Sequence, residues 1–472
     1  MSPSLMAAAL ITVEIILLCL RVPKASATIT TTSAIATEEN VHQQEQQQQI
    51  DNKDPFYSAV LRSLLGIELP DEFEVVYPYF ADEKGRFVTS LSEENENITR
   101  SDRKRRHVGS EKTKKTHRLF IGIEHQNEKL VLKLRTNKKF LAPHATVERL
   151  PSNNPQEKES LSNECYYIGR LKHQRHSIIA VDICDGLTGF IQAKERAYFI
   201  APLHGVQEHR TWSAHLLYPV NASIPISLAN DQWRDDDITE NRTIVERNIR
   251  SAITSNDVSD TSSPKIKEKY MAVTVAADHS VVEFHKNKVE QFILILMNIV
   301  NAIYSDPSLG AKLSIVVTRI ILLQQDENDK ISEGNSRQSL ENVCLWFKEM
   351  NRNHSGFKKH DIGIYLTRLD IGGPAGYAPV GGMCNPRRSC SLNRDEGLTS
   401  AFVIAHEIGH VLGFSHDGDE DERNTCSQDG AEGSIMAPLV LATFRKFHWS
   451  KCTVNEYRNK IKYVHLPVSG FA

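Results

Sequence analysis

Apolar residues follow two different rhythms along the chain. Between about residues 57 and 226 they form short runs or alternate with polar residues. The clearest runs are FEVVYPYF (73–80), RLFIGIEH (118–125), EKLVLKLRTN (128–137) and HSIIAVDIC (176–184). Short runs of this kind, separated by turn-forming residues, are typical of β-strands. This half of the chain therefore predicts one β-rich domain.

From residue 268 onward, strand-like and helix-like patterns alternate. Buried strands are predicted at 269–278, 313–323 and 361–368, and helices with apolar residues at helical spacing at 279–306, 336–351 and 397–413. Alternation of this kind predicts a mixed sheet flanked by helices, which is an α/β domain.

The remaining segments have the composition of leaders and linkers. The apolar run Met6–Leu20 precedes Ala25-Ser26-Ala27, an A-x-A type cleavage site, and therefore predicts a signal peptide. A membrane anchor is the competing interpretation, but the run is too short to span about 30 Å and Glu14 interrupts it. The predicted organisation is a signal peptide (1–27), a Gln-rich disordered segment (28–54), a β-rich domain (55–226), a polar linker (227–267) and an α/β domain (268–472).

Charge and cysteine content narrow the class of protein. A formal net charge of −3 favours neither a nucleic-acid partner nor an acidic solubility tail, and we expect no nucleic-acid partner. Cys19 would leave with the signal peptide, and the other seven cysteines of a secreted chain cannot all pair within one molecule. Cys165 and Cys184 flank two strand-like runs and are expected to form a disulfide that joins the two strands of a hairpin. The glycosylation triplets begin at Asn97, Asn221, Asn241 and Asn353.

The stretch AHEIGHVLGFSHDGD (405–419) carries the candidate chemistry. His406 and His410 are four residues apart on a predicted helix, so both imidazoles project from one face. Gly413 is expected to end the helix and turn the chain so that His416 returns to the first two histidines. Three imidazoles leave one zinc position open for water, and Glu407 can reach that water without binding the metal. The competing interpretation, histidines that merely cap a helix end, does not explain the fixed spacing.

A methionine is expected beneath such a site. Gly433-Ser434-Ile435-Met436-Ala437-Pro438 follows His416 by twenty residues and has the residues of a methionine turn.

Taken together, HEIGHVLGFSHD and SIMAP resemble the metzincin signature, and His416-Asp417 points to its adamalysin/reprolysin branch. The wider runs GYAPVGGMCNPRRSCSLNRDEGLTSAF and FHWSKC resemble the ADAMTS proteases (a disintegrin and metalloproteinase with thrombospondin motifs), most of all their procollagen amino-propeptidase branch. CYYIGR, DICDGLTGFI and YFIAPL resemble the propeptide of that family. The resemblance covers about residues 55–460 and implies a metzincin catalytic domain preceded by a β-rich propeptide domain.

The resemblance also implies roles for individual residues. His406, His410 and His416 would bind one catalytic zinc, Glu407 would be the general base and Met436 would lie under the metal. Its implied disulfides are Cys344–Cys390 and Cys426–Cys452, which leaves Cys384 unpaired because the family places its partner further along. For calcium, Ala272 stands where the family has a glutamate ligand, and Asp370 is the remaining candidate.

The expected function is therefore that of a secreted zinc metalloendopeptidase, made as a zymogen, that hydrolyses extracellular-matrix proteins, with procollagen as the candidate substrate. A proprotein convertase is expected to cut after Arg250, in Arg247-Asn248-Ile249-Arg250, and the basic run 103–106 is the other candidate site. We expect a monomer in the extracellular space or matrix, without a membrane anchor.

A second hypothesis stays open at this point. The family's downstream modules do not follow residue 460, so the sequence is expected to be a form that stops after the catalytic domain. Such a truncated isoform could be a secreted decoy that binds proteins without cleaving them. A structural matrix protein is a weaker third possibility because no repeat is visible.

Overall fold

The computed structural model describes residues 72–90, 118–150, 159–193, 196–203, 214–220, 226–227, 268–324, 330–353, 359–417, 434–440 and 448–461. The predicted signal peptide, the Gln-rich segment and nearly all of the linker lie outside the described residues.

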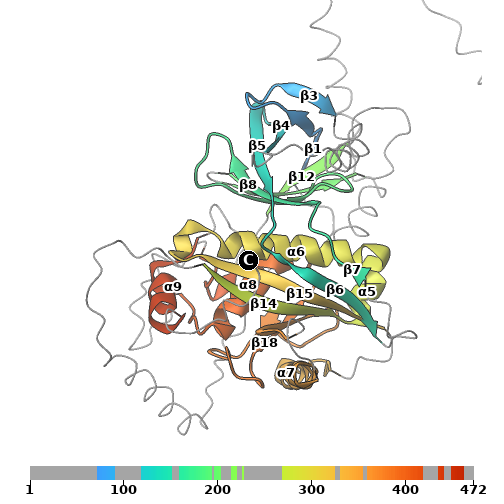
Figure 1. Ribbon diagram of the computed structural model, residues 1–472, viewed down its shortest axis with the longest axis vertical. Coiled ribbons are helices and arrows are strands. Elements are labelled where there is room, and N and C mark those ends of the chain that lie inside the picture. The colour runs from blue at the N-terminus through green and yellow to red at the C-terminus, as the bar shows by residue number, and fades with distance from the viewer. Residues whose placement is uncertain are drawn as a thin grey trace, which may run out of the picture. The chain divides into compact units, whose positions relative to one another are not determined.

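The N-terminal domain is a ten-stranded antiparallel sheet in the order β1-β12-β11-β10-β9-β8-β5-β4-β2-β3 (Figure 1). Its strands are β1 (Glu74–Val76), β2 (Tyr79–Ala81), β3 (Phe87–Ser90), β4 (Leu119–His125), β5 (Glu128–Thr136), β8 (Tyr166–Leu171), β9 (Ile178–Asp182), β10 (Thr188–Gln192), β11 (Ala197–Pro202) and β12 (His215–Pro219). The β8–β9 hairpin is closed by a disulfide between Cys165 and Cys184, the pair named from the sequence.

Both faces of the middle strands of this sheet are buried. Ile178 and Ala180 of β9 belong to one core cluster, and Ile179 and Val181 belong to another. Because successive side chains point to opposite faces of a strand, one face of the sheet packs within the N-terminal domain. The other face packs on helix α6, whose residues belong to the first cluster.

The C-terminal domain is a seven-stranded mixed sheet in the order β17-β18-β16-β14-β15-β6-β7. Its strands are β14 (Lys269–Ala277), β15 (Leu313–Leu323), β16 (Ile362–Thr367), β17 (Gly376–Tyr377), β18 (Cys390–Arg394), β6 (Leu141–Leu150) and β7 (Glu159–Ser160). The α-helices are α5 (His279–His285), α6 (Val289–Tyr304), α7 (Ser336–Arg352), α8 (Ser400–Val411) and α9 (Lys451–Glu456), with short helices η2 (Lys286–Lys288), η3 (Pro307–Leu309), η5 (Gly397–Thr399) and η7 (Tyr457–Ile461).

Helices cover both faces of this sheet, which confirms the predicted α/β class. Helices α6 and α8 share one core cluster with one face, and α7 shares a separate cluster with the other face. Figure 1 shows α6 between the two sheets and α7 on the far side of the C-terminal sheet. Helix α8 and the segments that follow it carry the candidate site.

Two features differ from the sequence predictions. The helix expected over 279–306 is interrupted at Lys286, because its φ of +51° lies outside the range of a right-handed helix. Strands β6 and β7 fall within the segment read as one β-rich domain, yet they are hydrogen-bonded into the C-terminal sheet, where β6 runs parallel to β15. A short separate ladder joins β13 (Ile226–Ser227) to β19 (Leu439–Val440).

Asp182, at the end of β9, is a buried acid at the junction of the two domains. Its carboxylate accepts hydrogen bonds from the Gln291 side chain on α6 and from the backbone N–H of Cys184. Burial is the largest influence on this group and raises its pKa to about 6 from an ordinary value of 3.8.

A raised pKa means that the folded protein holds the Asp182 proton more tightly than the unfolded chain does. The stabilisation that results is complete below about pH 4 and is lost as the pH rises to about 6, with a size on the order of 3 kcal/mol. We expect Asp182→Asn to flatten the pH dependence of the free energy of unfolding over this window, measured by urea denaturation. Glu128→Gln, at an exposed position on β5, should leave the dependence unchanged. An unchanged slope in the Asp182 variant would contradict the assignment.

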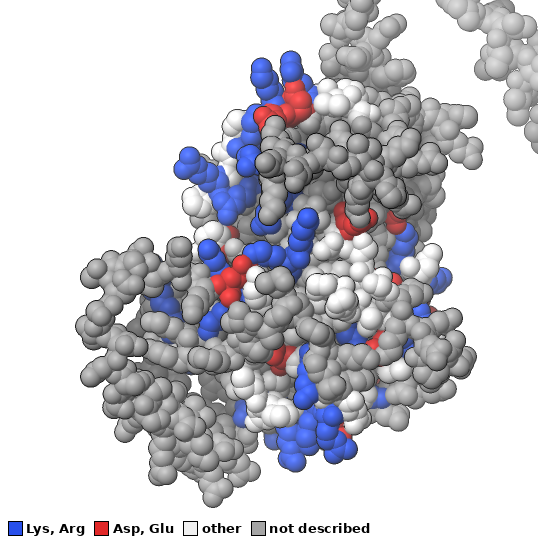
Figure 2. Space-filling view, viewed as in Figure 1, with Lys and Arg blue, Asp and Glu red and all other residues white. Residues whose placement is uncertain are grey.

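The surface carries both signs of charge. On the face drawn in Figure 2, Lys and Arg side chains lie among Asp and Glu side chains over both domains. Within the described part of the chain, the helices are all too short or too polar to cross a membrane.

Candidate active site

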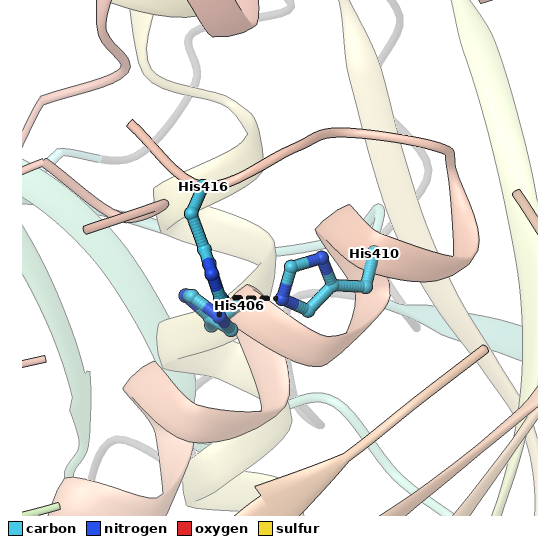
Figure 3. A group of neighbouring side chains, drawn as sticks. All are labelled: His406, His410 and His416. Carbon is cyan, nitrogen blue, oxygen red and sulfur yellow. Dashed lines mark hydrogen bonds between the residues drawn. The ribbon is translucent and has the colours of Figure 1, made fainter. Parts of the chain in front are cut away.

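Helix α8 presents the first two histidines of the motif. His406 and His410 lie one turn apart and are buried, with 1% and 8% of their surface exposed. After the helix, Gly413 adopts a φ of +93°, a conformation that favours glycine, and its N–H bonds the carbonyl of His410 at 2.8 Å. The chain therefore reverses and brings His416 over the helix (Figure 3).

The three imidazoles converge through one nitrogen each. The Nε2 atom of His416 lies 3.2 Å from that of His406 and 3.0 Å from that of His410. The Nδ1 atoms of His406 and His410 lie 2.7 and 2.9 Å from the carbonyl oxygens of Ile435 and Phe414. A carbonyl can only accept, so each Nδ1 carries the proton and each Nε2 lone pair points into the cluster.

Burial favours the neutral form of the two helix histidines. It lowers the pKa of His410 to about 3, and it holds the pKa of His406 far below its usual range, with the neighbouring histidines adding to the effect. Three imidazole nitrogen donors, all within 4.8 Å of one another, are the donor set that zinc takes in catalytic sites. The residues present therefore fit a zinc ion.

Glu407 lies beside this cluster in a site with little access to water. Its side chain is 2% exposed, and burial raises its pKa well above the usual range. A Cβ atom on Gly376 of β17 would lie 2.6 Å from the Oε1 atom of Glu407, so the glycine leaves room for the carboxyl group. Tyr304 of α6 bonds the carbonyl of Ala405 at 2.7 Å and anchors this turn of the helix.

Met436 packs against α8 between the two histidines of the helix. A Cβ atom on Gly409 would lie 2.5 Å from the Met436 sulfur, so the absence of a side chain at Gly409 lets the methionine reach the helix. The methionine turn is held by hydrogen bonds from Met436 N to Ser434 Oγ at 3.1 Å and from Asp417 N to Met436 O at 2.8 Å.

The loop that carries His416 is fixed from both sides. Ser415 donates to both carboxylate oxygens of Glu456 on α9, at 2.9 Å from its N–H and 2.9 Å from its hydroxyl. On the other side, the buried carboxylate of Asp417 accepts from Ser434 and, at 2.5 Å, from Ser450. Glu456 thus holds the residue next to the third histidine.

We expect Glu456→Ala to weaken zinc binding roughly tenfold, because partners that orient a ligand commonly affect metal affinity to this extent. Competition with a chromophoric chelator measures the affinity. Glu341→Ala, on the exposed surface of α7, is the control and should bind zinc as the unmodified protein does. Equal affinities in both variants would show that Glu456 does not hold His416.

The structure describes only some of the other predicted site residues. It contains a disulfide between Cys344 and Cys390, and Cys452 is also disulfide-bonded, while its predicted partner Cys426 lies outside the described residues. Cys384 is free and exposed, and Asn353 is exposed at the end of α7. The predicted cleavage site at Arg250 and the triplets at Asn97, Asn221 and Asn241 lie outside the described residues.

The candidate calcium positions do not form a cluster in the described part of the chain. The backbone N–H of Ala272 donates to Asp361 at 2.8 Å, and exposed Asp370 accepts from Gly372 N within its own turn. Apart from the three histidines, the described residues contain one further cluster of metal-binding residue types, Cys165, Asp182 and Cys184, and its cysteines form a disulfide.

The sequence alone does not indicate that three of these residues belong to the site, namely Gly376, Gly409 and Glu456. The two glycines matter through close approach of distant segments, and Glu456 lies 40 residues beyond His416 in number. The only local signal was the position of Gly409 inside a helix, where a glycine needs a packing reason.

The α/β fold, the two helix histidines, the returning third histidine and the methionine beneath them define a metzincin-type metallopeptidase domain. Residues 267–448 match the family described as Metallo-peptidase family M12 (reprolysin), and residues 74–172 match the Reprolysin family propeptide. The chain therefore carries a reprolysin metallopeptidase domain behind a reprolysin propeptide, and the family implies zinc as the metal.

Individual relatives extend this comparison. The chain is 39% identical over 373 residues to the Mus musculus protein named "A disintegrin and metalloproteinase with thrombospondin motifs 2". The aligned region covers 74% of this chain and 29% of that protein. It is 36% identical over 443 residues to the Homo sapiens protein named "A disintegrin and metalloproteinase with thrombospondin motifs 3". Here the aligned region covers 85% of this chain and 35% of that protein. The chain thus spans about a third of the length of these relatives.

Proposed function

We propose that this protein is a secreted zinc metalloendopeptidase, made as a zymogen, that cleaves extracellular-matrix proteins. The observation that carries the proposal is the convergence of the Nε2 atoms of His406, His410 and His416 beside the buried carboxyl group of Glu407. Procollagen is the candidate substrate, by analogy with the procollagen amino-propeptidase branch that the sequence resembles. Processing by a convertase after Arg250, N-glycosylation and a monomeric state belong to the same proposal.

The three histidines would hold the metal. When bound, zinc would polarise the scissile carbonyl and lower the pKa of a water molecule. Glu407 takes the proton of the attacking water and passes it to the leaving amine nitrogen. Calcium is not needed for any of these roles.

The substrate is proposed to lie along β17. This strand is the outermost one of its sheet and pairs antiparallel with β18. An extended peptide can add to such a strand through backbone hydrogen bonds. Gly376 of β17 is close to Glu407, so a peptide bound there would have its backbone near the base.

Removal of zinc tests the proposal. Protein cut in the linker is expected to hydrolyse a quenched peptide, to lose this activity with a strong zinc chelator and to regain it when zinc is restored. Bound zinc should also raise the melting temperature, because the metal binds only the folded site. Zinc binding without any turnover would instead support the non-catalytic decoy.

A further inference from the structure

Helix α6 is apolar on all sides, and 14 of its 16 residues are buried. A helix of this kind needs cover on both of its faces. In this protein one face packs on the C-terminal sheet and the other on strands β8, β9 and β10 of the propeptide, within one continuous core cluster. The propeptide therefore covers a surface that the catalytic domain cannot cover with its own described residues.

Buried asparagine side chains form hydrogen bonds across the interface between the propeptide and α6. The side-chain amide of Asn137, in the propeptide, donates to Asn298 at 2.9 Å and to Asn301 at 3.1 Å, both on α6. Asn298 in turn donates to the carbonyl of Tyr167 at 3.1 Å. All three asparagines are buried, at no more than 1% exposed. Buried amides cost free energy when they lose their partners, so this network favours the bound propeptide.

The propeptide also enters the catalytic sheet as a strand. Strand β6 pairs with β15 from Arg319↔Thr146 to Leu323↔Leu150, and the N–H of Val317 bonds the carbonyl of Phe140 at 2.7 Å. Strand addition supplies affinity through backbone hydrogen bonds that do not depend on the linker.

A third contact reaches the active-site helix. The ring of Phe402 on α8, one turn before His406, lies 5.4 Å from that of Phe190 and 6.2 Å from that of Phe199, measured between centroids. Both partner rings belong to the propeptide, on β10 and β11. The propeptide thus packs directly on the element that carries the candidate zinc ligands.

We propose that the propeptide stays bound to the catalytic domain after the linker is cut, so that processing yields a non-covalent complex of two fragments rather than a free catalytic domain. The interaction surface consists of α6, the outer side of β15 and Phe402, and the partner that fits it is the propeptide of the same chain. The proposal rests on the proposed function only in assuming that the linker is processed.

The test uses the whole protein with a site-specific protease sequence placed between residues 228 and 267. After complete cutting, the two fragments are expected to elute together in size-exclusion chromatography down to nanomolar concentration and to separate on a denaturing gel without reductant. The disulfide Cys165–Cys184 lies within the propeptide fragment, and Cys344–Cys390 lies within the catalytic fragment. Neither disulfide joins the two fragments. Elution of a free catalytic fragment with the melting temperature of the uncut protein would overturn the proposal.

A matched pair of variants tests the named interface. Asn137→Ala is expected to raise the dissociation constant of the cut complex roughly tenfold to a hundredfold, because the buried Oδ1 atoms of Asn298 and Asn301 lose the donor that Asn137 supplies. Lys133→Ala, at an exposed position on β5, should leave the constant unchanged. Equal constants for the two variants would contradict the assigned surface. Association is measured without reference to hydrolysis, so an inactive protein would still decide this proposal.

Discussion

Replacement of Glu407 by alanine is expected to reduce hydrolysis of a quenched peptide by about 10²- to 10⁴-fold, the usual contribution of a positioned acid–base group. The carboxyl group is buried next to His406. Helix α8 is held by its backbone hydrogen bonds, which the variant keeps. We therefore expect the variant to fold, to be secreted and to bind one zinc ion. Turnover, zinc content and melting temperature are the three measurements.

Two further variants make this test specific to the proton transfer. Glu407→Gln keeps the shape of the side chain but cannot take a proton, so it should be as inactive as the alanine variant. Glu396→Ala, just before η5 at the start of the same helical region, should retain activity. A well-folded Glu407→Ala protein that still cleaves the peptide would refute the role of Glu407 as the base.

Gly409→Ala is expected to destabilise the protein, although the same change in an exposed helix would stabilise it by about 1 kcal/mol. The new methyl group would lie 2.5 Å from the Met436 sulfur, which is closer than the atoms can approach, and in tight contact with Phe414 at 3.2 Å. Overpacking of this kind typically costs about 1–3 kcal/mol. Because Gly409 lies between His406 and His410, zinc affinity should fall as well. Thermal unfolding and chelator competition measure the two effects.

A double-mutant cycle with Met436→Ala separates the steric cause from a general effect on the helix. If the methionine is the obstacle, the double variant should be less destabilised than the sum of the two single variants, by about 0.5–3 kcal/mol. A higher melting temperature for Gly409→Ala alone would show that Met436 does not press on the helix.

The sequence predicted those parts of the fold that are encoded by local periodicity. The strand predicted at 313–323 is β15 with the same bounds, and the helix predicted at 336–351 is α7, which ends one residue later. The break at Lys286 was not predicted, because the apolar spacing continues across it. The placement of β6 in the catalytic sheet was not predicted either, since pairing between residues as far apart as Thr146 and Arg319 leaves no trace in the pattern of one segment.

The candidate site divides in the same way. The spacing of His406, His410 and Gly413 predicted a shared helix face and a turn, and the structure places these residues accordingly. Contacts between distant segments were not predictable, such as the carbonyl of Ile435 on His406 and the carboxylate of Glu456 on Ser415. The burial of His406 and His410 was not predictable either, because it depends on distant segments that exclude water from the helix.

Strand β6 has a consequence for the solubility of the catalytic domain. All eleven residues of β15 are buried, and β6 occupies its outer row of backbone hydrogen-bonding groups. Without that cover, a long apolar strand would present an open edge on which another copy of the chain can pair, which is a common start of aggregation. We expect the propeptide to prevent this pairing by occupying the edge of β15. Residues 268–472 produced without the propeptide are therefore expected to aggregate.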